Sequence, residues 1–165
     1  MVDDGSDKEM AVKGASKSRA GIDVTTSTGH LIRRAAQRYA AIWANLVSED
    51  LTSPQFGVLA LLDAGGQLDQ QTIGARGGLD KSTCGYLVDR MQRAGLVLAE
   101  VDPANRRRKL ISLTAAGRAR LSDALPLQRQ VQDSALAELT DGERVQLNRL
   151  LLKLLALQPN DKAPQ

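Results

Sequence analysis

The sequence predicts a mainly α-helical protein that carries one small β-hairpin. Apolar residues recur at helical spacing along most of the chain, and the pattern changes to the alternation of a strand between Leu96 and Leu113. Aromatic residues make up 2% of the chain, so the core must be built from Leu, Ile, Val and Ala, which suits packed helices.

The composition is that of an ordinary soluble protein. At 165 residues, 42% of them hydrophobic and 25% charged, the chain is long enough for one domain with an oligomerisation lobe. It has no uninterrupted apolar run of about 18 residues and no apolar signal core at its start, so we expect a cytoplasmic protein without a membrane segment. Residues 1–24 and 159–165 lack a periodic apolar face and are expected to be disordered tails, which leaves residues 25–158 as the folded part.

Two helices are predicted before the centre of the chain. The first runs from about Thr28 to Val47 and has one apolar face, made of Leu31, Ile32, Ala35, Tyr39, Ile42, Trp43 and Leu46. The second opens with Ser53 as the N-cap and Pro54 as the first helical residue, and it ends at Gly65–Gly66. We expect this second helix to be mostly buried.

Aspartates and glycines divide the centre of the chain into a helix, a turn, a second helix and a hairpin. Asp69 and Asp80 are expected to cap the two helices, which end at Gly77–Gly78 and at Gly95. The hairpin is predicted to consist of strands Leu96–Val101 and Lys109–Leu113 around the turn Asp102–Asn105. This order is that of a winged helix-turn-helix lobe, which we place at residues 53–113.

Basic residues gather in this lobe. From Arg76 to Lys109, eight basic residues stand against four acidic ones, a net charge of +4, whereas the whole chain carries +3. The run Arg106–Lys109 places consecutive cations at the predicted hairpin tip, where they repel one another unless an anion lies between them. We favour a nucleic-acid backbone as this anion over a merely solvated loop, because the wing of such a lobe reaches DNA.

Two more helices are predicted after the hairpin. Thr114 caps a long helix that Pro126 should kink or split. Thr140 and Glu143 form a capping box that starts a last helix, which is rich in large apolar residues: Val145, Leu147, Leu150, Leu151, Leu154, Leu155 and Leu157. One small lobe cannot cover so many, so we expect residues 25–48 and 115–158 to form a dimerisation lobe, the alternative being an intramolecular core.

The central motif resembles the DNA-binding lobe of the MarR (multiple antibiotic resistance regulator) family of bacterial winged-helix regulators. Order and spacing agree over about 45 positions, at Asp80-Lys81-Ser82-Thr83, Val88-Asp89-Arg90-Met91, Gly95-Leu96-Val97, Asp102-Pro103, Arg107 and Leu113-Thr114. The similarity extends more weakly from His30 to Leu157. The chain departs from the family at Gly85, where either the helix backbone lies close to DNA or glycine is simply tolerated, and also at Tyr86, Asn105 and Arg108.

The resemblance implies a homodimeric transcriptional regulator, in most cases a repressor, that binds an inverted-repeat operator in double-stranded DNA. The helix of residues 80–94 would enter the major groove, and the wing would follow the backbone or enter the minor groove. The residues expected to contact DNA are then Lys81, Ser82, Thr83, Gly85, Tyr86, Arg90, Arg106, Arg107 and Arg108. For Arg90, an ion pair with Asp89 or with a neighbouring helix is the alternative.

The resemblance also implies a small phenolic or aromatic carboxylate ligand, bound between the dimer helices and the winged lobe, that shifts the protein away from its DNA-binding form. His30, Arg34 and Arg38 are spaced four apart on the first helix, and Trp43 lies near the border of its apolar face. An arginine could hold the carboxylate while the aromatic ring stacks on the ligand, although simple solvation of these arginines explains the pattern as well or better.

Other kinds of site are weaker readings of the sequence. His30 has no nucleophile or motif around it and no Gly-rich phosphate loop is present, so we expect no enzyme and no cofactor. One cysteine and one histidine cannot supply the ligands of a structural zinc site, and Cys84 is expected to be a small core residue and not a redox sensor. The remaining alternative is a winged-helix module that binds proteins or shapes DNA without responding to a ligand.

Overall fold

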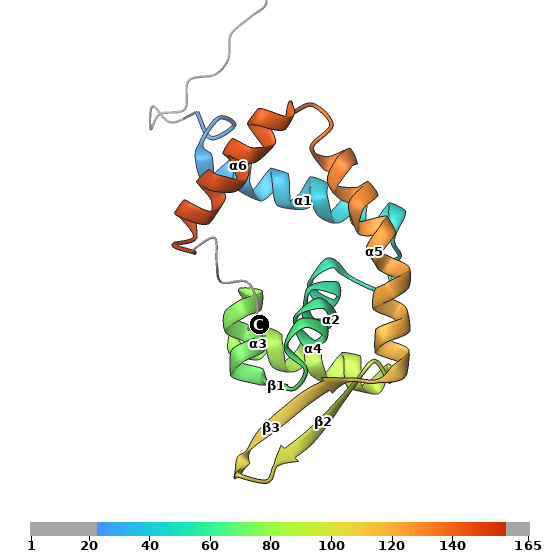
Figure 1. Cartoon of the computed structure of the whole chain (residues 1–165). Helices are drawn as coiled ribbons and strands as arrows, with labels where there is room; N and C mark the ends of the chain where they lie inside the picture. The colour runs from blue at the N-terminus through green and yellow to red at the C-terminus, as the bar shows by residue number, and fades with distance from the viewer. Residues whose placement is uncertain (1–22, 158–165) are drawn as a thin grey trace, which may run out of the picture. The chain divides into compact units, whose positions relative to one another are not determined.

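The computed structural model describes residues 23–157, which divide into two units at Ala36/Gln37 (Figure 1). The predicted tails, residues 1–24 and 159–165, lie outside the described residues apart from Asp23 and Val24. In the first unit, Asp23 accepts hydrogen bonds from the N–H and the hydroxyl of Thr25 in a turn that leads into α1 (Thr28–Leu46). The bounds of α1 agree with those of the first predicted helix to within one residue.

Aromatic side chains join the end of α1 to the start of α2 (Ser53–Gly65) within the second unit. Trp43 is only 2% exposed, and its indole N–H donates to the carbonyl of Leu51. The ring centroid of Trp43 lies 5.1 Å from that of Phe56 and 6.4 Å from that of Tyr39. These contacts bury Trp43 and leave Tyr39 and Phe56 half-buried.

The N-cap of α2 is Thr52, so the prediction of Ser53 was wrong by one residue. The Oε1 atom of Gln55 accepts hydrogen bonds from the N–H of Thr52 (2.8 Å) and from its hydroxyl (3.1 Å). Gln55 thus accepts both the N–H and the hydroxyl of Thr52, whereas Ser53 is followed three residues later by Phe56, which has no polar side chain to do the same. The helix ends at Gly65, and the C-cap residue Gly66 has a φ of +70°, which favours glycine.

Helices α3 (Gln70–Gly77) and α4 (Lys81–Arg93) form the predicted helix-turn-helix. Asp69 caps α3 by accepting the N–H of Thr72, and Asp80 caps α4. The turn between the helices is tight because Gly78 adopts the left-handed conformation, with φ +63° and ψ +31°. Both caps were predicted from the sequence and are confirmed.

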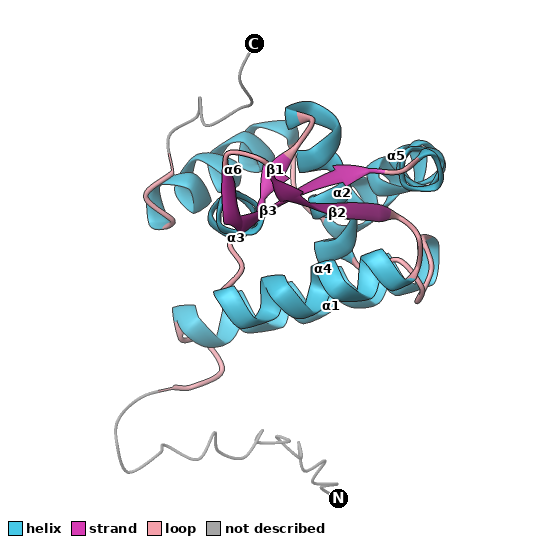
Figure 2. Cartoon of the chain, turned by 90° about the horizontal axis from the view of Figure 1, so that it is seen from below, coloured by secondary structure: helices cyan, strands magenta, loops and turns pink. Residues whose placement is uncertain are grey.

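The wing is a three-stranded antiparallel sheet of order β1-β3-β2, and not a simple hairpin. Its strands are β1 (Leu68–Asp69), β2 (Val97–Asp102) and β3 (Asn105–Leu113) (Figures 1 and 2). Leu68 pairs with Ile111 and Asp69 with Leu110, so β1 ties the start of α3 to the middle of the wing. The predicted return strand was therefore too short, and β1 was missed.

The basic run lies within β3 and not in the hairpin turn. Val101 pairs with Lys109 while Asp102 pairs with Asn105, so the register skips Arg106, Arg107 and Arg108. These arginines form a bulge opposite β2 just after the tip, so the prediction that they lie at the tip itself was wrong. A bulge twists the strand and redirects its side chains.

The core of the second unit packs α2, α3, α4 and the start of α5 (Ala115–Ala135) against the sheet. Its buried side chains are almost all aliphatic, namely Leu51, Val58, Leu59, Leu62, Ile73, Cys84, Leu87, Val88, Met91, Val97, Ile111, Leu113, Leu121 and Ala124. The mainly helical fold with a β wing is thereby confirmed. No helix among residues 23–157 is long and apolar enough to cross a bilayer.

Two helices follow the wing. α5 is capped by Thr114 and remains one helix through Pro126, so the proline does not split it. Proline removes one backbone donor, and the hydrogen bonds on either side hold the helix together. α6 (Asp141–Leu154) begins at the predicted capping box of Thr140 and Glu143, and none of its fourteen residues is buried.

Candidate nucleic-acid interface

Asp80 organises the N-terminus of α4. One carboxylate oxygen accepts the N–H groups of Ser82 and Thr83 at 3.0 Å each. The same carboxylate accepts both hydroxyls, at 2.8 Å from Ser82 and 2.6 Å from Thr83. Both hydroxyls, which belong to predicted DNA-contacting residues, thus donate their protons to Asp80. Each hydroxyl oxygen can then only accept a hydrogen bond from a ligand, unless the hydroxyl rotates.

The same hydrogen bonds hold the pKa of Asp80 well below its usual value, chiefly through the hydroxyl and N–H of Thr83. A depressed pKa means that the carboxylate stabilises the fold above the unfolded-state pKa, about 3.9, and that this stabilisation is lost as the pH falls through the acidic range. We expect Asp80→Asn, which keeps a cap but does not titrate, to lose less stability than the unaltered protein between pH 5 and pH 2. Thermal unfolding at a series of pH values measures this, and parallel curves for the two proteins would contradict it.

One face of α4 packs into the core and the other is open. Cys84, Leu87, Val88 and Met91 are buried. The open face carries most of the predicted DNA-contacting residues of this helix, Lys81, Ser82, Thr83, Tyr86 and Arg90, and the Tyr86 side chain is 63% exposed. Arg90 forms no ion pair with any described residue. The alternative role for Arg90, an ion pair with Asp89 or with a neighbouring helix, is therefore not found in the described part of the chain.

Gly85 lies at the contact between α4 and α3. A Cβ atom at Gly85 would lie 3.0 Å from Nε2 of Gln70, which itself donates to the carbonyl of Lys81 at 3.3 Å. Glycine therefore lets the side chain of Gln70 approach the first turn of α4. The packing of α4 on α3 is thus a physical reason for glycine at this position, and the sequence alone did not reveal it.

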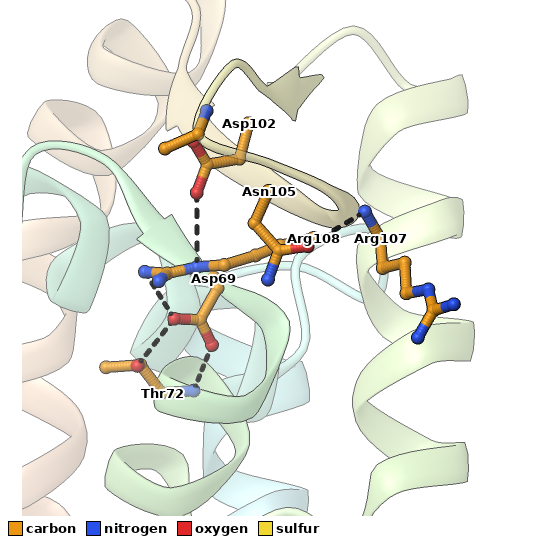
Figure 3. A network of polar contacts seen from close by, with 7 residues as sticks. Asp69, Thr72, Asp102, Asn105, Arg107 and Arg108 are labelled. Carbon is orange, nitrogen blue, oxygen red and sulfur yellow. Dashed lines mark hydrogen bonds and ion pairs between the residues drawn. The ribbon is translucent and has the colours of Figure 1, made fainter.

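The arginines of the bulge have different surroundings (Figure 3). The N–H of Arg107 donates to Oδ1 of Asn105 at 3.1 Å, so the amide of Asn105 caps the backbone just after the turn. The Arg108 side chain faces Asp69, with 2.8 Å between Nη2 and Oδ2, while the Arg107 guanidinium points away from this carboxylate. Arg106 is exposed and forms no ion pair with a described residue.

An open groove of about 1150 Å³ separates α4 from the wing and is floored by α3. Lys81 lines one side, and Arg107, Arg108 and Lys109 line the other. The groove is also lined by Asp69 and Asp89, which were not among the predicted site residues. Asp69 had been predicted only as a helix cap. Its closeness to the basic run could not be predicted, because it depends on the pairing of β1 with β3.

The predicted ligand residues all lie on α1 but differ in exposure. In the first unit, Nδ1 of His30 lies 3.0 Å from Nη2 of Arg33, and Arg34 is exposed. In the second unit, Arg38 is exposed and Trp43 is buried. A ligand ring can stack on the indole only if a neighbouring side chain moves.

Cys84 is 1% exposed, and its thiol donates to the carbonyl of Gln70 at 3.4 Å. Burial, with the charge of Asp80, raises the pKa of the thiol, which disfavours the reactive thiolate. The prediction of a core cysteine is confirmed. Within the described part of the chain, no group of three or more His, Cys, Asp and Glu side chains could hold a metal ion.

Comparison with known proteins identifies the family. Residues 49–108 match the sequence model described as MarR family. The chain is 32% identical over 154 residues to the HTH-type transcriptional repressor NicR of Pseudomonas putida, an alignment that covers 93% of this chain and 98% of NicR.

Solved structures agree with this match. The PcaV transcriptional regulator of Streptomyces coelicolor, in complex with its natural ligand, superposes with a TM-score of 0.78 at 36% identity, covering 82% of this chain and 96% of PcaV. BpsR of Bordetella bronchiseptica, whose DNA binding is regulated by 6-hydroxynicotinic acid, gives a TM-score of 0.72 at 34% identity, covering 76% of this chain and 96% of BpsR. The chain therefore belongs to the MarR family of winged helix-turn-helix transcriptional regulators.

Proposed function

We propose that the protein is a homodimeric repressor that binds an inverted-repeat operator in double-stranded DNA and is released from it by a small aromatic acid. The observation that carries this proposal is the groove between α4 and β3, because basic side chains lie on both of its sides. An α-helix fits the major groove of B-DNA, and a phosphate backbone beside that groove would then pass between α4 and the wing.

The residues on the two sides of the groove suit different parts of DNA. Tyr86 stands on the open face of α4, where it can reach base edges or a thymine methyl group. Arg106 and Arg107 in the bulge are free to follow the backbone or enter a narrow minor groove. Lys81, at the first turn of α4, adds a phosphate contact beside the positive end of the helix dipole.

Dimerisation is supported by the apolar surface that α6 exposes. Val145 is 69% exposed and Leu154 62%, Leu150 and Leu151 are also exposed, and the exposed Leu155 and Leu157 follow directly after the helix. Exposed apolar side chains in such number are uncommon on a monomer and typical of an interface. We accordingly assign residues 25–48 and 115–158 to a dimerisation lobe and residues 53–113 to the DNA-binding lobe.

A carboxylate ligand is supported by exposed arginines on α1 and by the regulation of BpsR by 6-hydroxynicotinic acid, an aromatic acid. Arg34 and Arg38 are the candidate carboxylate partners. Trp43 would act as a wall behind Tyr39, since its own ring is covered. His30 completes the candidate set with an imidazole that now faces Arg33.

The test is fluorescence anisotropy of the protein on DNA taken from directly upstream of its own gene, at two salt concentrations and with a panel of pyridine and benzene carboxylic acids. Specific binding that weakens steeply with salt and that one acid abolishes is the expected result. Binding that no acid relieves would remove the ligand from the proposal. Absence of salt-sensitive binding would favour a protein-binding or architectural winged helix.

A further inference from the structure

Arg108 joins the wing to the first helix of the helix-turn-helix. Its Nη2 atom lies 2.8 Å from Oδ2 of Asp69, and its Nε atom lies 3.7 Å from Oδ2 of Asp102. The two carboxylate side chains are only 15% and 12% exposed, whereas that of Arg108 is 49% exposed. One guanidinium therefore faces two carboxylates from different strands, Asp69 of β1 at the start of α3 and Asp102 at the end of β2 (Figure 3).

Both carboxylates are fixed independently of Arg108. Asp69 accepts the N–H of Thr72 at 2.8 Å and its hydroxyl at 3.0 Å as the cap of α3. Asp102 accepts the N–H of Ala104 at 2.9 Å within the turn at the wing tip. The cap bonds from Thr72, together with Arg108, hold the pKa of Asp69 below its usual value, so the ion pair persists at neutral pH.

The strand register explains why Arg108 can reach Asp69. β1 pairs with β3 only at Leu110 and Ile111, so the preceding bulge lies beside the cap of α3. Arg107 belongs to the same bulge but forms no ion pair with a described residue. The two neighbouring arginines, equal in charge, therefore have opposite surroundings.

A phosphate near Arg108 would also approach two carboxylates, and their repulsion would offset the attraction of the guanidinium. Holding the wing in one orientation, by contrast, lowers the cost of ordering it on DNA. We propose that Arg108 is a positioning residue that fixes the wing on α3 through Asp69 and Asp102, whereas Arg107 neutralises a phosphate. This inference rests on the proposed DNA binding and assigns different roles to residues that the sequence placed together as DNA contacts.

The first experiment compares Arg107→Ala with Arg108→Ala, a matched pair that removes the same charge from the same bulge. Operator affinity is measured by anisotropy over a series of salt concentrations. We expect Arg107→Ala to reduce the slope of log affinity against log salt by about 1.8, because the dimer loses one phosphate contact in each of its two subunits and each contact contributes about 0.9. Arg108→Ala should weaken binding about three- to tenfold at every salt concentration with the slope unchanged. A slope reduced equally by both variants would overturn the proposal.

The second experiment measures the mobility of the wing tip in the absence of DNA. A nitroxide spin label is attached to Ala104→Cys at the wing tip, and Cys84 is too buried to compete for the label. We expect Arg108→Ala to narrow the spectrum, because the tip moves more freely, and Arg107→Ala to leave it unchanged. Asp69→Asn keeps the helix cap but removes the charge, and should act as Arg108→Ala does.

The two readouts separate this inference from the proposed function. If the unaltered protein fails to bind DNA, the spin label still reports whether Arg108 holds the wing. If DNA binding is confirmed and the label is equally immobile in the unaltered protein and in Arg108→Ala, the positioning role is wrong and the repressor proposal stands.

Discussion

Replacing Gly117 with alanine is expected to lower the free energy of unfolding by about 2–4 kcal/mol. Gly117 lies buried in the first turn of α5, and a Cβ atom there would overlap the carbonyl oxygen of Leu96 and lie 3.2 Å from Cδ2 of Leu113. The same carbonyl accepts the N–H and the hydroxyl of Thr114, each at 3.1 Å. The helix cannot move aside without breaking the bonds that join it to the wing.

Urea unfolding monitored by circular dichroism measures this effect. Gly142→Ala is the matched control, because Gly142 also lies in the first turn of a helix and has no atom within 4 Å of the added Cβ. It should leave the stability unchanged or raise it by up to about 1 kcal/mol, through the better helix propensity of alanine. Equal stability of the two variants would show that the contact with Leu96 relaxes at little cost.

The parts of the fold that follow from local chemistry were predictable from the sequence. The caps at Asp69, Asp80, Thr114 and Thr140 each depend on side chains within three residues, and all four form as predicted. The displaced cap of α2 is a local error of one residue. Glycine at the ends of α2 and α3 likewise marked both turns correctly.

The parts that depend on contacts distant in sequence were not predictable. β1 has only two residues, and its partners lie about 40 positions later in β3, so no periodic pattern in the sequence predicts this strand. The contact of Gly85 with Gln70 depends on how two helices pack. For the basic run, the cluster of charges was predictable, but the pairing of Arg108 with Asp69 and Asp102 was not, because those carboxylates reach Arg108 only through the strand register.

Introducing a charge at Leu154 is expected to abolish the proposed dimer and, with it, tight operator binding. Leu154 is 62% exposed in the last turn of α6, beside the exposed Leu150 and Leu151. Leu154→Asp removes no contact from the core, so the single chain should fold as before. A carboxylate placed in an apolar interface, however, must be dehydrated without a partner, which costs several kcal/mol.

The loss of DNA affinity should be much larger than any single DNA contact explains. Two linked half-site contacts bind the inverted repeat more tightly than one by about 100-fold or more, so a monomer loses this whole factor. Sedimentation velocity and anisotropy on the operator measure the two effects together.

The control for Leu154→Asp is Gln146→Asp, which adds the same charge to an exposed position of α6 that lies one and two turns before Arg149 and Lys153. It should leave both the dimer and the operator affinity unchanged. If Leu154→Asp also remains a dimer, α6 is not the interface. If it becomes a monomer that still binds the inverted repeat with undiminished affinity, each half-site is bound independently. The exposed leucines of α6 must then contact a partner other than the second DNA-bound subunit.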